Sequence, residues 1–300
     1  TIRIAMQAVC SRTPQGAMRR AMTEPNPYLL DDGPTCISFS GGRTSAYMLH
    51  HILDAHDGRL PDDVEVCFAN TGKERPETLD FVQECGERWD VGVTWLEYDP
   101  DAEHKTKIVS HNSAARSGEP FDALIAAKQY LPNPVTRFCT VELKIRRMHF
   151  HMYRSCGHEH WASAVGLRAD EMHRVSRARA RNELGKDRDY VIAPLAEAGA
   201  TLHDITEFWC EQPFDLRLRP LEGNCDLCFL KGAGKRIEIM RARPDLAAWW
   251  IAKETTIQAS KPTGARFRHE HTYAELLDFT QRQMNLDFGD DAAVDCFCTD

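Results

Sequence analysis

Residues 38–45, with the sequence SFSGGRTS, are the first stretch of this chain whose residue types and spacing could do chemistry. They lie between a short β-rich run, Thr35–Phe39, and a segment with helical character, Thr44–His56. Glycines let a backbone approach an anion closely, and the start of a helix supplies free N–H groups and the positive end of its dipole. The pattern favours a phosphate-binding loop, although a Gly-Gly turn before a helix also has a purely structural interpretation.

Cysteines form the second chemical pattern, and the chain contains 11 of them. Cys225 and Cys228 make a Cys-x-x-Cys pair in a turn with Gly and Asn, and Cys296 and Cys298 lie close to the C-terminus. Such spacing is typical of metal binding or of redox chemistry. Most of the others have no ligand spacing and are expected to pack as small hydrophobic residues. These are Cys10, Cys36, Cys67, Cys85, Cys156 and Cys210.

Strands and helices alternate through the first two thirds of the chain, which predicts βαβ units and a parallel sheet. Further strands are expected at Val64–Ala69, Val93–Tyr98, Trp161–Val165 and Tyr190–Ala193, and a helix at Glu77–Trp89. Residues 100–135 are rich in proline and are expected to pass over the carboxyl edge of the sheet. We therefore predict an N-terminal arm (1–34), a nucleotide-binding domain (35–200) and a C-terminal helical region with a cysteine loop and a cysteine tail (201–300).

Composition excludes several classes of protein. The 37 basic and 45 acidic residues give a net charge of −8, which argues against a protein held to nucleic acid by bulk charge. No apolar run is long enough to span a membrane, and no apolar signal core begins the chain. We expect a cytoplasmic protein with no membrane partner.

Four segments, in order, resemble motifs of one superfamily. Residues 38–45 resemble the PP-loop, Ser-Gly-Gly-x-Asp-Ser, of ATP pyrophosphatases. Asn70–Leu79 is similar to the Asn-Thr-Gly-x-x-x-Pro-Glu-Thr segment of the phosphoadenylylsulfate (PAPS) reductase superfamily. Cys139–Lys144 resembles its Cys-x-x-x-Leu-Lys segment, and Gly166–Glu171, followed by Arg174, its Gly-x-Arg-x-x-Glu segment. The resemblance implies an α/β fold with a doubly wound, mostly parallel sheet, of the adenine nucleotide alpha hydrolase-like kind.

The same resemblance implies roles for individual residues. ATP or an adenylyl sulfate would lie across the carboxyl edge of the strands, with Mg²⁺ bridging its phosphates. Lys144, Arg168 and Arg174 would face the anionic portion of the substrate as catalytic residues. The nucleotide-binding set is Ser38, Ser40, Gly41, Gly42, Thr44, Ser45, Asn70, Thr71, Gly72 and Gly166. Thr44 stands where the family has Asp, so the loop lacks a carboxylate that could place a metal ion.

The cysteines favour one branch of this superfamily. Iron–sulfur centres occur in several of its thiolation and DNA-phosphorothioation enzymes and in adenylyl-sulfate reductases. Cys139, Cys225, Cys228 and a tail cysteine, Cys296 or Cys298, supply the four thiolates that a [4Fe–4S] cluster uses. Zinc, a redox dithiol and no ligand role remain alternatives.

The intact Ser-Gly-Gly of the loop favours an enzyme that splits ATP and releases pyrophosphate. In such chemistry an acceptor oxygen is adenylated and sulfur then displaces AMP. A nucleic-acid acceptor and a sulfur-donor or electron-donor protein are the expected partners. One alternative is a reductase that converts PAPS or adenylyl sulfate to sulfite with Cys298 or Cys296 as nucleophile. Another is a non-catalytic nucleotide-binding subunit of a modification complex.

Two further patterns have a structural and a functional interpretation. Basic residues concentrate between Arg168 and Arg188, as a solvated helix or as a surface that faces nucleic acid. Three His-x-His pairs, among them His149 and His151, could bind zinc, but surface or core histidines are favoured.

Overall fold

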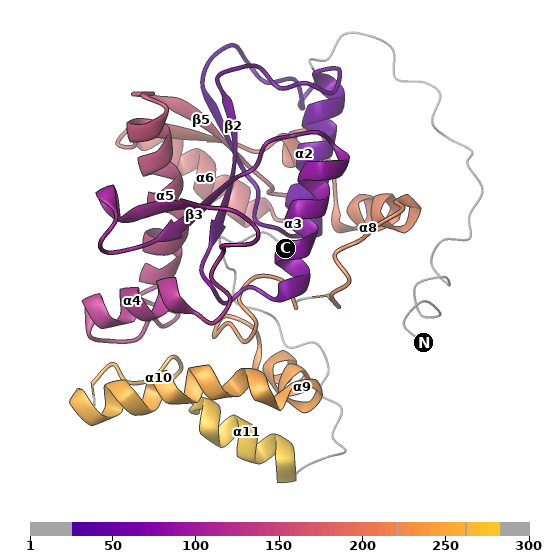
Figure 1. The fold of residues 1–300 in the computed structure, drawn as a ribbon. Coiled ribbons are helices and arrows are strands. Elements are labelled where there is room, and N and C mark those ends of the chain that lie inside the picture. The colour runs from indigo at the N-terminus through magenta and orange to yellow at the C-terminus, as the bar shows by residue number, and fades with distance from the viewer. Residues whose placement is uncertain (1–25, 221, 262, 283–300) are drawn as a thin grey trace.

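The computed structural model describes residues 26–220, 222–261 and 263–282. Its centre is a six-stranded sheet in the order β4-β3-β2-β1-β5-β6 (Figure 1). The strands are β1 (Thr35–Ser38), β2 (Val64–Asn70), β3 (Thr94–Tyr98), β4 (Thr106–Val109), β5 (Trp161–Val165) and β6 (Asp189–Ile192). All pairings are parallel except β3 with β4, which confirms the predicted α/β fold with a mostly parallel sheet.

Alternating residues of the central strands divide the core between the two faces of the sheet. Ile37 and Phe68 belong to the larger core under helices α2 (Arg43–Ala55), α3 (Pro76–Arg88) and α8 (Leu202–Glu211). Cys36 and Cys67 face the other side with Met152. That side is covered by one long helical stretch and by α6 (Met172–Leu184) (Figure 1). The stretch is π-helical at its ends, η2 (Thr140–Ile145) and η3 (His151–Ser155), with α5 (Arg146–Phe150) between them.

The segment expected to pass over the sheet edge does more than that. After the single turn η1 (Glu103–Lys105) it adds the antiparallel edge strand β4, which the sequence did not predict. The chain then returns to the carboxyl edge, where the Asn70 Nδ2 donates to the Ala115 carbonyl over 2.9 Å. α4 (Glu119–Lys128) follows.

The C-terminal helices form a second layer beyond the carboxyl edge, beside α4 (Figure 1). The helices of this layer are α9 (Ala233–Ala242), α10 (Ala247–Ser260) and α11 (Tyr273–Arg282). Two single turns complete the helical elements, α7 (Pro194–Glu197) and η4 (Pro244–Leu246). Fully buried Trp250 and Phe267 centre a separate core that also includes Phe121 of α4. Within the described ranges, no helix has the length and apolarity needed to cross a bilayer.

Candidate nucleotide and cysteine site

The loop between β1 and α2 has the geometry of an anion-binding turn. α2 begins at Arg43, and its N-cap residue, Gly42, makes no side-chain cap hydrogen bond. The first N–H groups of a helix have no partner within the helix, so this end offers donors to an anion. Gly41 has φ +80°, and a Cβ there would lie 2.7 Å from Cγ2 of Thr78. Only glycine therefore fits at Gly41 without strain.

The hydroxyls of this loop shape it from within. The Ser45 Oγ accepts from the Ser40 N–H at 3.2 Å, donates to the Gly42 carbonyl at 3.0 Å and lies 2.9 Å from the Ser40 Oγ. Thr44 and Ser45 are almost fully buried. Because these side chains face inward, the groups that the loop presents to a phosphate are chiefly backbone N–H groups. Ser38 and Ser40 lie on the wall of the adjoining cavity.

Asn70 braces the turn at the end of β2. Its Nδ2 donates to Glu97 Oε1 at 2.6 Å, and its Oδ1 accepts the Gly72 N–H at 3.0 Å. Burial raises the pKa of Glu97, while hydrogen bonds from the Ala115 N–H and from Asn70 oppose that rise. Gly72, at φ +76°, packs closely on Gly118. The Asn70 amide is therefore engaged inside the protein, and the turn approaches a ligand through its backbone.

The same turn holds a buried carboxylate between a lysine and a cysteine. Glu74 Oε2 accepts from both the N–H and the hydroxyl of Thr71, at 2.8 and 2.7 Å. Its other oxygen lies 3.4 Å from Lys144 Nζ, close enough for an ion pair but not aligned as a hydrogen bond. The Thr71 hydroxyl is also 3.4 Å from Cys225 Sγ, and Glu74 and Cys225 form a β-bridge.

A buried ion pair docks the cysteine loop onto this turn. Lys73 Nζ lies 3.0 Å from Asp226 Oδ2, and both side chains are more than nine-tenths buried. The Asp226 N–H donates to the Lys73 carbonyl at 2.8 Å, while Asp226 Oδ1 accepts from Trp250 Nε1 at 2.8 Å. A charge buried this deeply is stable only when paired and hydrogen-bonded. The docking therefore joins two segments about 150 residues apart in the sequence.

These docking residues were not predicted from the sequence. Lys73 and Glu74 occupy the variable positions of the Asn-Thr-Gly segment, and Asp226 lies inside the Cys-x-x-Cys pair. The only hint in the sequence was that these positions are charged, and charge alone does not show that a side chain is buried.

Three of the four expected cluster cysteines lie in the described residues, and all pack against the core of the C-terminal helices. They are Cys139, which immediately precedes η2, and Cys225 and Cys228, where the Cys228 N–H donates to the Cys225 carbonyl at 3.3 Å. Burial and the Glu74 carboxylate hold the pKa of the Cys225 thiol well above its ordinary value, against the opposing effect of Lys144. Cys296 and Cys298 lie outside the described residues.

The three thiols are soft donors of the kind that Zn²⁺ and iron–sulfur clusters bind. Sulfur ligands of one tetrahedral Zn²⁺ lie about 3.8 Å apart, given a Zn–S bond of about 2.3 Å. Among the described residues, no three ligand atoms that include Cys139, Cys225 or Cys228 all lie within 4.8 Å of one another. In a [4Fe–4S] cluster each thiolate binds a different iron, so the ligands stand farther apart. Three thiols supplied by two segments around one buried core suit that arrangement.

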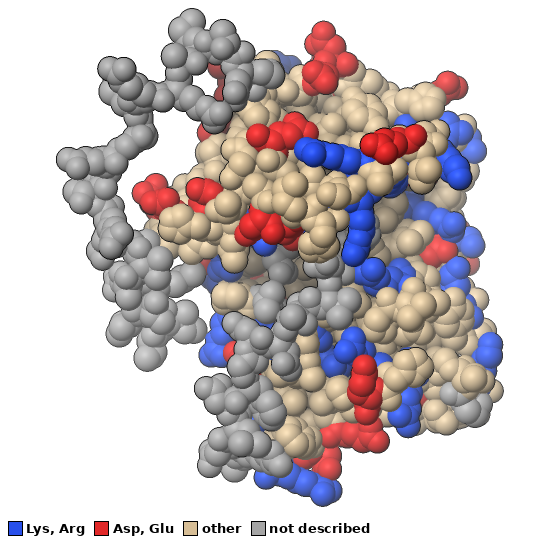
Figure 2. Space-filling model, turned by 180° about the vertical axis from the view of Figure 1, so that it is seen from behind, with Lys and Arg blue, Asp and Glu red and all other residues tan. Residues whose placement is uncertain are grey.

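A cavity of about 480 Å³ opens from the loop along the face of the sheet that η2, α5 and α6 cover. Lys144 and Arg177 line it, together with Val165. Figure 2 shows that basic side chains also gather on one half of the rear surface. A cavity with a phosphate-binding loop and cationic side chains is suited to an anionic ligand.

The structure places the remaining predicted residues close to the loop but not on the wall of this cavity. Gly166 directly follows β5 and is buried. The Arg168 Nε donates to Asp170 over 2.9 Å, and Arg174 Nη1 donates to Glu171. Both guanidinium groups are thus partly neutralised by carboxylates of their own segment.

The fold and the loop define an α/β protein with a PP-loop. A sequence profile, the phosphoadenosine phosphosulfate reductase domain, matches residues 34–208, more than half of the chain. The chain belongs to this family.

One curated relative and one solved structure are similar to this chain. An uncharacterized nin-region protein, ORF290 of Escherichia phage lambda, is 30% identical over 210 residues, which cover 66% of this chain and 67% of that protein. The U34-tRNA thiolase NcsA of Methanococcus maripaludis, solved with its [4Fe–4S] cluster, aligns with 85% of this chain and 73% of its own. Its identity of 15% and TM-score of 0.39 are too low to bear on the chemistry of this chain.

Proposed function

We propose that this protein is a PP-loop enzyme that binds ATP and carries out iron–sulfur-dependent sulfur activation or transfer, with nucleic acid as the acceptor. The observation that carries the proposal is the 3.4 Å contact between Cys225 Sγ and the Thr71 hydroxyl. It joins the cysteine loop to the segment that ends β2, at the edge where a doubly wound sheet binds nucleotides.

In the proposed reaction the backbone N–H groups at the start of α2 bind the phosphates. A bound Mg²⁺ would neutralise phosphate charge, and the phosphates themselves would have to hold it, because Thr44 supplies no carboxylate. An acceptor oxygen attacks the α-phosphorus of ATP, its P–O bond forms, and pyrophosphate leaves. Sulfur from a donor then displaces AMP from the adenylated acceptor. Positioning and charge neutralisation are the main contributions of the protein to such steps.

The residues around Cys225 have distinct tasks in this scheme. Lys144 offsets the charge of Glu74, and Arg177 and Lys144 neutralise the anion in the cavity. Cys139, Cys225 and Cys228 would hold the cluster, with Cys296 or Cys298 as fourth ligand or with that iron left open. When bound, a cluster with an open iron supplies a site for the sulfur atom that is transferred.

A second candidate is reduction of PAPS or adenylyl sulfate to sulfite, and the family match favours it. In that reaction a cysteine thiolate attacks the sulfur atom of the sulfonucleotide. The leaving group is AMP from adenylyl sulfate or adenosine 3′,5′-bisphosphate from PAPS. Thioredoxin then supplies the electrons that release sulfite. Lys144 and the start of α2 would then bind a sulfonucleotide in place of ATP.

One experiment separates the two reactions. The full-length protein, purified without oxygen, is given either ATP with Mg²⁺, sulfide as sulfur donor and bulk tRNA or DNA, or PAPS and adenylyl sulfate with reduced thioredoxin. We expect pyrophosphate from ATP, with sulfur incorporation into the nucleic acid lost in Cys225→Ser. Sulfite release without pyrophosphate would establish the reductase in its place. Nucleotide binding with neither product would point to the non-catalytic subunit.

A further inference from the structure

A second group of metal-ligating side chains lies under the sheet, away from the cysteine loop. Glu65 and Cys67 occupy alternate positions of β2 and therefore point to the same face. Cys36 of β1 pairs in register with Glu65 and shares that face. The helical stretch that covers this face contributes His151, and Cys156 follows it. His151 belongs to one of the His-x-His pairs, but the sequence alone does not join it to Glu65 and Cys67, because β1, β2 and the end of the helical stretch meet only in the fold.

The ligand atoms of this group are already close together. Those of Glu65, Cys67 and His151 all lie within 4.8 Å of one another. His151 Nε2 is 3.2 Å from Glu65 Oε2 and 3.5 Å from Cys156 Sγ. In a tetrahedral zinc site with bonds of about 2.0–2.3 Å, neighbouring ligand atoms stand roughly 3.3–3.8 Å apart. The ligand atoms of Glu65, Cys67 and His151 are thus close to the spacing of a metal site, and Cys156 adjoins the group through its contact with His151.

We propose that Glu65, Cys67 and His151 bind one divalent transition-metal ion, with Zn²⁺ as the preferred ion and with Cys156, beside His151, as the fourth ligand once its side chain turns toward the group. Two thiolates, one imidazole and one carboxylate form a donor set that Zn²⁺ accepts readily. None of these residues belongs to the nucleotide loop or the cysteine loop, although Cys67 also lines the cavity beside the nucleotide loop.

The surroundings of His151 support a ligand role for its Nε2. The residue is 6% exposed, and among the described residues its Nδ1 has no hydrogen-bond partner. Its Nε2 is the ring nitrogen that faces the other ligands, since it lies 3.2 Å from Glu65 Oε2 and 3.5 Å from Cys156 Sγ. A metal ion in the group would therefore bind at Nε2.

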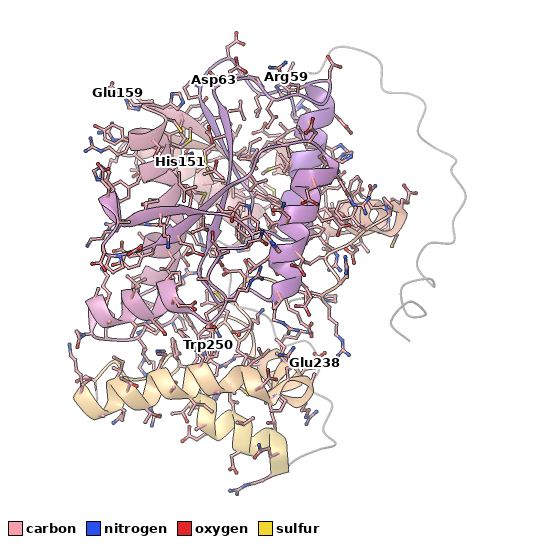
Figure 3. All side chains as sticks on the ribbon, in the orientation of Figure 1. Arg59, Asp63, His151, Glu159, Glu238 and Trp250 are labelled. Carbon is pink, nitrogen blue, oxygen red and sulfur yellow. The ribbon has the colours of Figure 1, made fainter. Side chains whose placement is uncertain are left out.

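Neighbouring groups hold the other ligands in place. The Thr94 hydroxyl donates to Glu65 Oε2 at 3.2 Å, and the thiols of Cys36 and Cys67 are hydrogen-bonded. Contacts of this kind orient metal ligands and tune their basicity. Four protein ligands with no open position are typical of a structural site, and this one would fasten η3 to β2. His151 and Trp250 mark how far the site lies from the C-terminal helices (Figure 3).

The test measures the metal content of a variant that lacks the two thiols of the cysteine loop. The full-length Cys225→Ser/Cys228→Ser double variant is purified with reductant, dialysed against metal-free buffer and analysed for zinc by mass spectrometry. We expect about one zinc per chain. Adding His151→Ala, or Cys67→Ser, should lower it at least tenfold, whereas adding Cys210→Ser on α8 should not. Co²⁺ added alone should produce a thiolate charge-transfer band that Cys156→Ser weakens.

Circular dichroism of each protein checks that it is folded. Cys156→Ser is the variant least expected to disturb folding, because the side chain of Cys156 is only half-buried. Zinc should raise the melting temperature of the double variant but not that of its His151→Ala derivative. Equal zinc in both proteins, or zinc lost already in the double variant, would overturn the proposal. So would failure of the double variant to bind micromolar Zn²⁺ or Co²⁺.

Discussion

Two groups of cysteines occupy this protein in contrasting surroundings. Cys139, Cys225 and Cys228 lie at the carboxyl edge of the sheet, where loops and a buried ion pair hold them. Cys36, Cys67 and Cys156 lie under the sheet, two of them on rigid central strands. Loop-held groups next to a ligand site can adjust to a reaction, whereas strand-held groups cannot. The contrast supports our proposals that the edge group serves chemistry and the group under the sheet serves structure.

The largest expected effect comes from breaking the docking of the edge group. Asp226→Ala removes the partner of Lys73 and the acceptor of the Trp250 indole N–H. A buried lysine left without its carboxylate costs about 3–5 kcal/mol. We expect urea denaturation to show that loss, together with loss of cluster iron and retention of zinc under the sheet.

Asp245→Ala is the matched control, since its pair with Arg243 is exposed. Surface pairs contribute about 0–1 kcal/mol. Equal losses in the two variants would show that the buried pair is not what holds the cysteine loop.

A smaller, pH-dependent effect is expected on the side of the sheet that carries Cys67. Burial alone would raise the pKa of Asp189, but hydrogen bonds from His149 and Arg181 outweigh it and hold that pKa far below its ordinary value. Because its pKa is depressed, the ionised carboxylate stabilises the fold at pH values above about 3.9, the ordinary pKa of Asp. This contribution is lost as the pH falls below that value.

Asp189→Asn should therefore lower the free energy of unfolding by about 2–3 kcal/mol at pH 7. The difference in the free energy of unfolding between Asp189→Asn and wild type should become smaller as the pH falls toward about 4. Asp187→Asn, which alters an exposed contact of the same Arg181, should cost under about 1 kcal/mol. A gap for Asp189→Asn that stays constant with pH would contradict this account.

The smallest expected effect on stability tests the nucleotide loop. Gly41→Ala forces alanine into a left-handed conformation, at about 1–2 kcal/mol, and pushes its Cβ against Thr78. Displacement of the loop should weaken ATP binding about tenfold, by calorimetry, and leave both metal contents unchanged. Gly58→Ala has nearly the same φ, +81°, with no atom within 4 Å, so it should share the strain without losing affinity.

Local signals in the sequence predicted five of the six strands and the glycine-containing loop between β1 and α2. The strands at residues 35, 64, 94 and 161 and the helices that follow the first two lie where apolar periodicity and glycines predicted them. The short edge strand β4 was missed, because Thr106–Val109 is four residues long and half exposed, with no clear alternation.

The docking of the cysteine loop could not be predicted in the same way. Lys73 and Asp226 pair across about 150 residues, and nothing in the local sequence shows that a charged residue will be buried. The ligands under the sheet were missed for the same reason, since strand register and helix packing bring Cys67 to His151. Long-range pairing of this kind depends on the whole fold.

The most direct test of the central claim is the iron and acid-labile sulfide content of protein purified without oxygen, in wild type, Cys225→Ser and Cys67→Ser. A cluster on the edge group predicts about four irons and four sulfides in wild type and in Cys67→Ser, and their loss in Cys225→Ser. Folded wild-type protein without iron, or iron that survives Cys225→Ser and disappears in Cys67→Ser, would contradict the assignment of chemistry to the edge group.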